Sequence, residues 1–169
     1  MRTSAEMFAL FTRIARSDER IRAATLAGSR VNSSVPPDAW QDYDVTFLVT
    51  DVDSFTRSDA WLAAFGDIVF LHTPAAMELF PPAFPAGGFP SLMLFSDGTK
   101  IDLTLVPDTD AAEYARQDPL IRVLLDKDGI CADVKEPSDE RFWIQKPRPA
   151  YIGDCANEFF FACTYTARG

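Results

Sequence analysis

The stretches IRAATLAGSR (residues 21–30) and QDYDVTFLV (residues 41–49) decide the fold. In the first, an apolar run from Ile21 to Ala27 ends at Gly28-Ser29, which predicts a β-strand followed by a turn. In the second, two acids precede the apolar run Val45–Val49, which predicts another strand. Residues 31–40 contain one Asn, two Ser and two Pro, a composition typical of a loop.

Helices and further strands are predicted on both sides of this pair. An amphipathic helix is expected over Ser4–Arg16, with Ser4 as its N-cap. Residues 74–90 are expected to be an irregular excursion, and Asp97-Gly98 predicts a hairpin turn. The other expected helices are Ser54–Phe65, Asp110–Arg116 and Tyr151–Thr166, and the other expected strands are Ile68–Leu71, Ser91–Phe95, Thr99–Val106 and Ile121–Leu125. These elements together predict an α+β fold (mixed α/β), with helices packed on one mixed sheet.

The length of 169 residues favours one compact domain. We expect a catalytic domain over residues 1–130, a polar, proline-containing linker over 131–149, and the start of a C-terminal helical region over 150–169. That last helix has a large apolar face, which needs a partner, and a second copy of the chain is one candidate. The apolar face consists of Ile152, Cys155, Phe159, Phe160 and Cys163.

Charge and composition narrow the function classes. The formal net charge is −9, which argues against a nucleic-acid partner and favours a cationic small molecule. Solubility is the alternative explanation of the acidity. No apolar run of 18 or more residues predicts a membrane span, and no secretory signal is recognisable. The three cysteines form no C-x-x-C pair, so a cytoplasmic chain without a zinc site is expected.

Asp42 and Asp44 are candidate metal ligands. In a strand, alternate side chains point to the same face, so the two carboxylates should lie together with Tyr43 opposite. Like charges this close repel one another, and a divalent cation relieves the repulsion. Mg²⁺ prefers oxygen ligands of this kind, together with substrate phosphates.

A third acid, Asp102, lies in the later strand. Alternation places Lys100, Asp102 and Thr104 on one face of that strand and its apolar residues on the other. If the two strands are neighbours in the sheet, three carboxylates meet at one point. Such a trio can hold one or two metal ions for phosphoryl transfer.

The turn Gly28-Ser29-Arg30 is a candidate phosphate loop. Glycine allows a tight turn and a close approach of the backbone to a phosphate, and backbone N–H groups in such a turn bind anions. Ser29 offers a hydroxyl donor and Arg30 a guanidinium. A surface turn and surface acids explain each motif separately, but their order along the chain favours a functional site.

Motifs along nearly the whole chain resemble those of the streptomycin (aminoglycoside) 6-adenylyltransferases, which have the polymerase-beta-like nucleotidyltransferase fold. The matching segments are Asp18-Glu19-Arg20-Ile21-Arg22, Gly28-Ser29-Arg30, Gln41-Asp42-Tyr43-Asp44, Phe95-Ser96-Asp97-Gly98 with Ile101-Asp102-Leu103, Leu124-Leu125-Asp126-Lys127-Asp128, Asp139-Glu140-Arg141-Phe142-Trp143 with Lys146-Pro147, and Asn157-Glu158-Phe159.

The resemblance implies transfer of AMP from ATP, with Mg²⁺, to a hydroxyl of an aminoglycoside, and hence antibiotic resistance. It implies metal ligation by Asp42, Asp44 and Asp102, and a nucleotide-phosphate loop at Gly28, Ser29 and Arg30. Asp102 is also a candidate for the general base, with Glu158 as the rival. Family members continue into a further helical domain after the Asn-Glu-Phe helix, so a shortened chain is expected here.

Three functional hypotheses remain open from the sequence. The first is an aminoglycoside adenylyltransferase; the second is an enzyme of the same fold with another small-molecule or protein acceptor. The third is a non-catalytic fragment that binds nucleotide. His72, the only histidine, is interpreted as structural, and Lys127 is either a nucleotide contact or a solvated turn residue. Residues 81–90 are either a lid or a surface loop.

Overall fold

The computed structural model describes residues 2–38, 41–76, 87–135 and 137. They belong to one compact unit, residues 1–139. The described strands are β1 (Ile21–Ala27), β2 (Tyr43–Val49), β3 (Ile68–His72), β4 (Phe89–Phe95), β5 (Lys100–Pro107) and β6 (Ile121–Asp126). The helices are α1 (Ser4–Ser17), α2 (Asp53–Thr56) and α3 (Ala111–Gln117), with short 3-10 segments η1 (Gly28–Arg30), η2 (Asp59–Phe65), η3 (Pro74–Ala76) and η5 (Asp108–Asp110).

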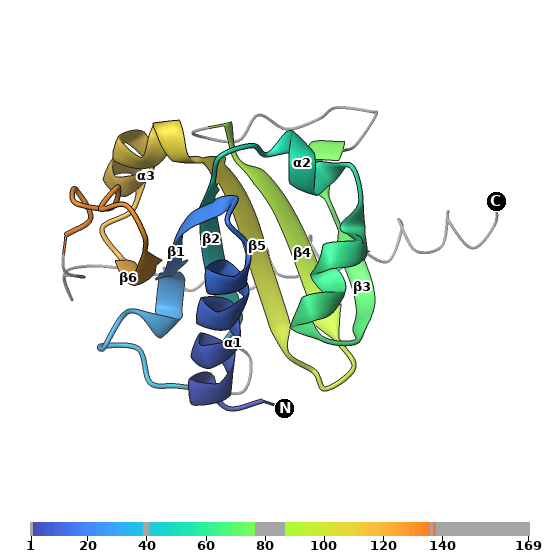
Figure 1. Ribbon diagram of the computed structural model, residues 1–169. Coiled ribbons are helices and arrows are strands. Elements are labelled where there is room, and N and C mark those ends of the chain that lie inside the picture. Colours follow the sequence, from blue (N-terminus) through green and yellow to red (C-terminus); the bar gives the residue numbers. More distant parts are fainter. Residues whose placement is uncertain (1, 39–40, 77–86, 136, 138–169) are drawn as a thin grey trace, which may run out of the picture. The chain divides into compact units, whose positions relative to one another are not determined.

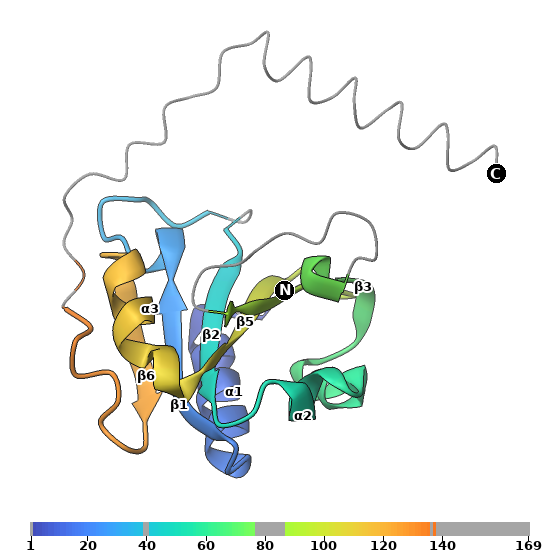
Figure 2. The same ribbon diagram turned by 90° about the horizontal axis from the view of Figure 1, so that it is seen from above.

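The six described strands form one mixed sheet in the order β3-β4-β5-β2-β1-β6 (Figures 1 and 2). Only the central pair, β2 and β5, is parallel among these strands; the other pairs are antiparallel. The α+β fold predicted from the sequence is therefore confirmed. The predicted β4–β5 hairpin is also confirmed, with Gly98 N donating to Phe95 O across the turn.

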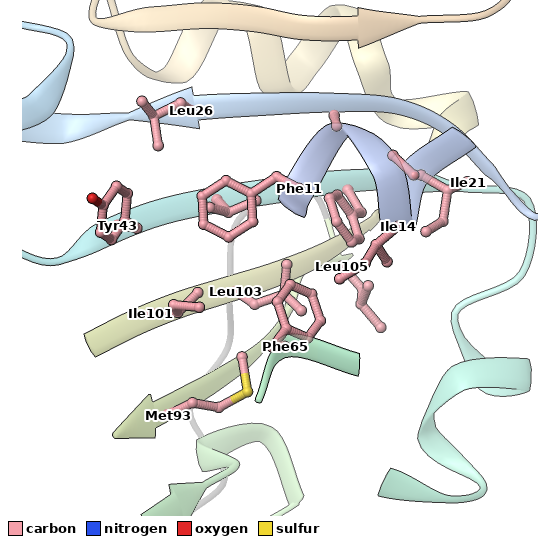
Figure 3. Packing of buried hydrophobic residues seen from close by; sticks show 14 of the residues in the cluster. Phe11, Ile14, Ile21, Leu26, Tyr43, Phe65, Met93, Ile101, Leu103 and Leu105 are labelled. Atoms are coloured by element: carbon pink, nitrogen blue, oxygen red, sulfur yellow. The ribbon is translucent and has the colours of Figure 1, made fainter. Parts of the chain in front are cut away.

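The two faces of the sheet are covered differently. Helix α1 and the α2–η2 segment pack on one face, where Phe11 and Phe65 join the apolar residues of β2 and β5 (Figure 3). Phe55 of α2 belongs to the same cluster. Helix α3 packs on the opposite face, where Tyr114 lies with Leu48 and the other residues of a smaller cluster. The carboxylates predicted to bind metal lie on this second face, near the N-terminal ends of β2 and β5.

The N-cap of α1 lies one residue before the cap that the sequence predicted. Thr3, not Ser4, is the N-cap, because its side chain accepts from Glu6 N while the Glu6 carboxylate accepts from Thr3 N at 2.8 Å. This reciprocal pair is a capping box. Its signature, Thr-x-x-Glu, is present in the sequence one residue before the cap that was predicted.

The helix predicted over Ser54–Phe65 is two short segments, α2 and η2. Ser58 interrupts it, because this residue has an extended backbone and its hydroxyl accepts from Ala60 N at 3.3 Å. A serine side chain that bonds to a nearby backbone group competes with helical hydrogen bonds and starts a new segment. The other described elements agree with the prediction to within two residues at each end.

Several sequence predictions fall outside the described residues. They include most of the excursion at 74–90, the linker beyond residue 137 and the helix Tyr151–Thr166 with Glu158. Among the described residues, Cys131 is a free, buried cysteine, and burial raises its pKa to about 11. No helix in the described part of the chain is long and apolar enough to cross a membrane.

The capping box yields a stability prediction. Thr3→Ala should lower the free energy of unfolding by about 1 kcal/mol, because it removes the cap of α1. Ser4→Ala, the matched control at the neighbouring position, should have a smaller effect. Urea denaturation monitored by circular dichroism measures both, and a larger loss in Ser4→Ala would contradict the assignment of the cap.

Candidate functional site

The parallel pairing of β2 with β5 brings the three predicted acids together. In this register Asp44 lies directly opposite Asp102. One carboxylate oxygen from each of Asp42, Asp44 and Asp102 lies within 4.8 Å of the others. The sequence predicted this meeting only on the condition that the two strands were neighbours, and the structure meets that condition.

Alternation along both strands gives the acids their common face. Tyr43 is 3% exposed and packs edge-on against Phe8 and Phe11 of α1, so the residues on either side of it point to the opposite face. In β5, Ile101 and Leu103 are buried in the same core. The apolar residues therefore pack each strand against the core on the α1 side of the sheet. The acids project from the other face, which α1 does not cover.

Lys100 provides the positive charge of the cluster. Its Nζ donates to Asp42 Oδ2 at 2.7 Å and to Asp102 Oδ2 at 3.2 Å. Although burial lowers the pKa of Lys100, these two hydrogen bonds raise it above its ordinary value overall. The sequence placed Lys100 on the same face as Asp102 but assigned it no role.

Arg30 contacts the backbone that carries Asp42. Its Nε donates to Asp42 O at 2.7 Å, and a terminal nitrogen donates to Gln41 O at 2.6 Å. The guanidinium also lies 3.8 Å from the centre of the Tyr43 ring, a cation–π geometry. In this arrangement Arg30 fixes the approach to β2, a role that the sequence interpretation of Arg30 as a phosphate ligand did not foresee.

Gly28 is required by its contact with Asp44. Its φ is +73°, a left-handed conformation that residues with a Cβ rarely adopt. A Cβ at this position would overlap Asp44 Oδ2 and lie 3.1 Å from Asp44 Cγ. The glycine therefore leaves space for a carboxylate of the cluster, in addition to forming the turn that the sequence predicted.

The electrostatics of the cluster disfavour full ionisation. Burial, followed by the negative charges of Asp42 and Asp102, raises the pKa of Asp44 to about 6. Burial also raises the pKa of Asp102, against the opposing hydrogen bond from Lys100. The strand register holds these acids together despite their repulsion, so a bound cation would stabilise the arrangement.

The residues present fit a hard divalent cation such as Mg²⁺. The donor set is made of carboxylate oxygens, which such ions prefer. Among the described residues, Asp102 Oδ1 is the one buried side-chain oxygen or nitrogen without a hydrogen-bond partner. Buried polar atoms are normally satisfied, so an atom of this kind requires an explanation, and a ligand at the cluster provides one.

The remaining candidates lie away from the cluster. His72 ends β3 and pairs with Leu92, which in turn pairs with Asp102, so two strand spacings separate His72 from the acids along the sheet. Lys127 Nζ donates to Asp18 O at 3.0 Å, which favours the structural reading of this turn. Glu158, the rival base, lies outside the described residues.

Comparison with known proteins assigns the chain to a family. A family model described as "Streptomycin adenylyltransferase" matches residues 1–169. The chain belongs to the streptomycin adenylyltransferase family. The resemblance noted from the sequence motifs is thereby confirmed.

Curated relatives in the family carry the name aminoglycoside 6-adenylyltransferase. The chain is 45% identical to the protein from Bacillus subtilis (strain 168), 46% to that from Campylobacter jejuni and 38% to that from Staphylococcus aureus. All of this chain is covered in each case, but only 60%, 58% and 60% of the respective relatives. The chain therefore spans about three fifths of their length.

A solved structure supports the fold of this family member. The crystal structure of an aminoglycoside 6-adenyltransferase from Bacillus subtilis matches with a TM-score of 0.64 and 38% sequence identity. The match covers 100% of this chain and 57% of that one. The mixed sheet with packed helices is thus shared with a solved protein of the family.

A pair of glycine variants separates two effects on stability at Gly28: the contact with Asp44 and the strain of the left-handed backbone. Gly28→Ala should lower the free energy of unfolding by about 1–2 kcal/mol for the left-handed backbone, and further because the new Cβ displaces Asp44. Gly129→Ala is the matched control, because Gly129 has a φ of +72° and open space around it. Urea denaturation that gave equal losses in the two variants would contradict the contact.

The raised pKa of Asp44 predicts a pH effect. Between about pH 4 and 6 the folded chain binds a proton at Asp44 that the unfolded chain releases, so this group lowers the free energy of unfolding as the pH rises. Without divalent metal, Asp44→Asn should therefore be more stable than the parent at pH 7, by about 1–2 kcal/mol after solvent screening. The stability gain should vanish near pH 4.

Urea denaturation from pH 4 to 8 measures this difference. Asp67→Asn is the control, because it removes a negative charge from an exposed site outside the cluster. A loss of stability in Asp44→Asn at pH 7 would contradict the raised pKa of Asp44.

Proposed function

We propose that this chain carries the nucleotide and metal site of an adenylyltransferase, which transfers AMP from ATP to a hydroxyl of an aminoglycoside such as streptomycin. The observation that supports this most is the convergence of Asp42, Asp44 and Asp102 across the parallel strands β2 and β5. Family membership adds the reaction class, and the names of the relatives add the acceptor class.

The three carboxylates are proposed to hold Mg²⁺. When bound, Mg²⁺ would neutralise charge on the phosphate oxygens during the displacement. Arg30 holds the backbone of Asp42 by donating to its carbonyl oxygen. The chain thus orients this ligand before any metal arrives, and a site that is oriented in advance needs less reorganisation.

Gly28 and Ser29 are proposed to receive the phosphates of the nucleotide. The turn follows β1 directly and contacts Asp44, so a phosphate bound there would lie beside the metal ligands. Arg30 is proposed as a further phosphate ligand of this loop, as its sequence position predicts, and its guanidinium also holds the backbone that leads into β2.

Asp102 is the proposed general base among the described residues. Burial raises the pKa of its carboxyl group, which makes the carboxylate a better proton acceptor. Its Oδ1 has no hydrogen-bond partner, whereas Oδ2 accepts from Lys100. One oxygen is therefore held in place while the other remains available to a ligand or a hydroxyl proton.

The acceptor is proposed to be a cationic small molecule. The chain has a formal net charge of −9, which attracts polyamines and repels nucleic acids. The second candidate function is nucleotide binding without turnover, which the carboxylate cluster and the Gly28 turn beside it would also serve. Calorimetry that detects Mg²⁺–ATP binding without AMP transfer would favour this candidate.

Substitution of the acids tests the proposed function. Asp42→Asn and Asp44→Asn should each lower ATP-dependent adenylylation of streptomycin at least about 100-fold, because each removes a charged metal ligand. Asp67→Asn, which removes an exposed acid outside the cluster, should leave the rate unchanged. Release of pyrophosphate and the mass of the antibiotic are measured, and full activity in Asp42→Asn would overturn the metal assignment.

A further inference from the structure

The ammonium group of Lys100 lies where the carboxylate cluster most needs positive charge. We propose that Lys100 is a built-in counter-cation, which neutralises part of the cluster in the metal-free protein and must be displaced when a divalent cation binds. This inference rests on the proposed metal site and adds a means by which the chain itself controls the occupancy of that site.

The hydrogen bonds of Lys100 engage two of the three carboxylates. Nζ lies 2.7 Å from Asp42 Oδ2 and 3.2 Å from Asp102 Oδ2. Register explains the bridge: Lys100 precedes Asp102 by two residues on the same face of β5, and β5 runs parallel to the strand that follows Asp42. The lysine is therefore placed by the same pairing that assembles the acids.

A divalent cation and this ammonium compete for the same oxygens. Two cations within about 4 Å repel each other strongly near a protein surface, and an oxygen that accepts from Nζ has a lone pair fewer for a metal. The side chain of Lys100 is 49% exposed, so its flexible stem can release the ammonium to solvent without disturbing the core. A divalent cation can therefore displace the Lys100 ammonium, but the hydrogen bonds of Lys100 to Asp42 and Asp102 oppose the displacement.

Lys100 also affects the stability of the sheet around the cluster. Buried apolar neighbours, Tyr43 and Ile101, fix the strands from the other face, so Asp42 and Asp102 cannot move apart freely. Without a cation, their repulsion would act against the pairing of β2 with β5. Lys100 therefore stabilises the sheet in the absence of metal and weakens metal binding by the same contacts.

Lys100→Met tests both consequences, because methionine keeps an unbranched stem and removes the charge. In titration calorimetry with Mn²⁺ alone, the dissociation constant should fall about tenfold relative to the parent, the size expected for removing one positive charge near a bound cation. In the absence of metal, the thermal midpoint should fall, and added Mn²⁺ should raise it more than in the parent.

Lys135→Met is the control for net charge, since Lys135 is an exposed lysine outside the cluster. It should leave the dissociation constant and the midpoint at the parent values. An unchanged or weaker Mn²⁺ affinity in Lys100→Met would overturn the proposal. So would an equal gain in affinity in Lys135→Met, because the effect would then come from overall charge.

A double variant keeps the proposal testable if Lys100→Met folds poorly. Combining Lys100→Met with Asp42→Asn removes one charge of each sign from the cluster, so the metal-free midpoint should recover towards that of the parent. Failure to recover would show that the loss came from packing and would overturn the electrostatic account. If the parent itself binds no Mn²⁺, the proposed metal site fails, which is a result distinct from either outcome for Lys100.

Discussion

The parallel pairing of β2 with β5 is the constraint on which the rest of the structure depends. It is the only parallel pair among the described strands, and it sets Asp44 opposite Asp102. Carboxylates repel, so nothing in their own chemistry would bring them together. Burial of Tyr43, Ile101 and their neighbours against α1 provides the opposing free energy, because each large apolar side chain removed from water contributes about 1.5–3 kcal/mol.

Much of the site could be predicted from the sequence because strand alternation is a local rule. Asp42, Asp44 and Asp102 were placed on one face from their spacing, and the structure agrees. The roles of Gly28 and Arg30 beside Asp44 and Asp42 could not be derived in the same way. They arise from contacts between η1 and β2, which are separated by a loop whose path the sequence does not specify.

The fold shows the same division between local and distant information. The apolar runs located the strands, and Asp97-Gly98 located the hairpin. The interruption at Ser58 was missed because the apolar spacing continues through it, although the serine hydroxyl starts a new helical segment. Some residues of the family motifs form ion pairs between segments that are far apart in the sequence. Arg22, at the start of β1, pairs with Asp128 after β6 at 2.5 Å. No pattern along the chain indicates such a partner.

The number of residues between the β4–β5 turn and Asp102 determines which face of the sheet carries the Asp102 side chain. Side chains of a strand alternate between faces, so one extra residue in β5 after this turn would send Asp102 into the core and Ile101 towards the cluster. The core side would resist such a slip, because Met93 pairs with Ile101 and both are buried. An insertion at this hairpin should therefore be tolerated only if Asp102 stays on the cluster face of β5 and Ile101 stays on the core face. The residues of the turn itself matter less.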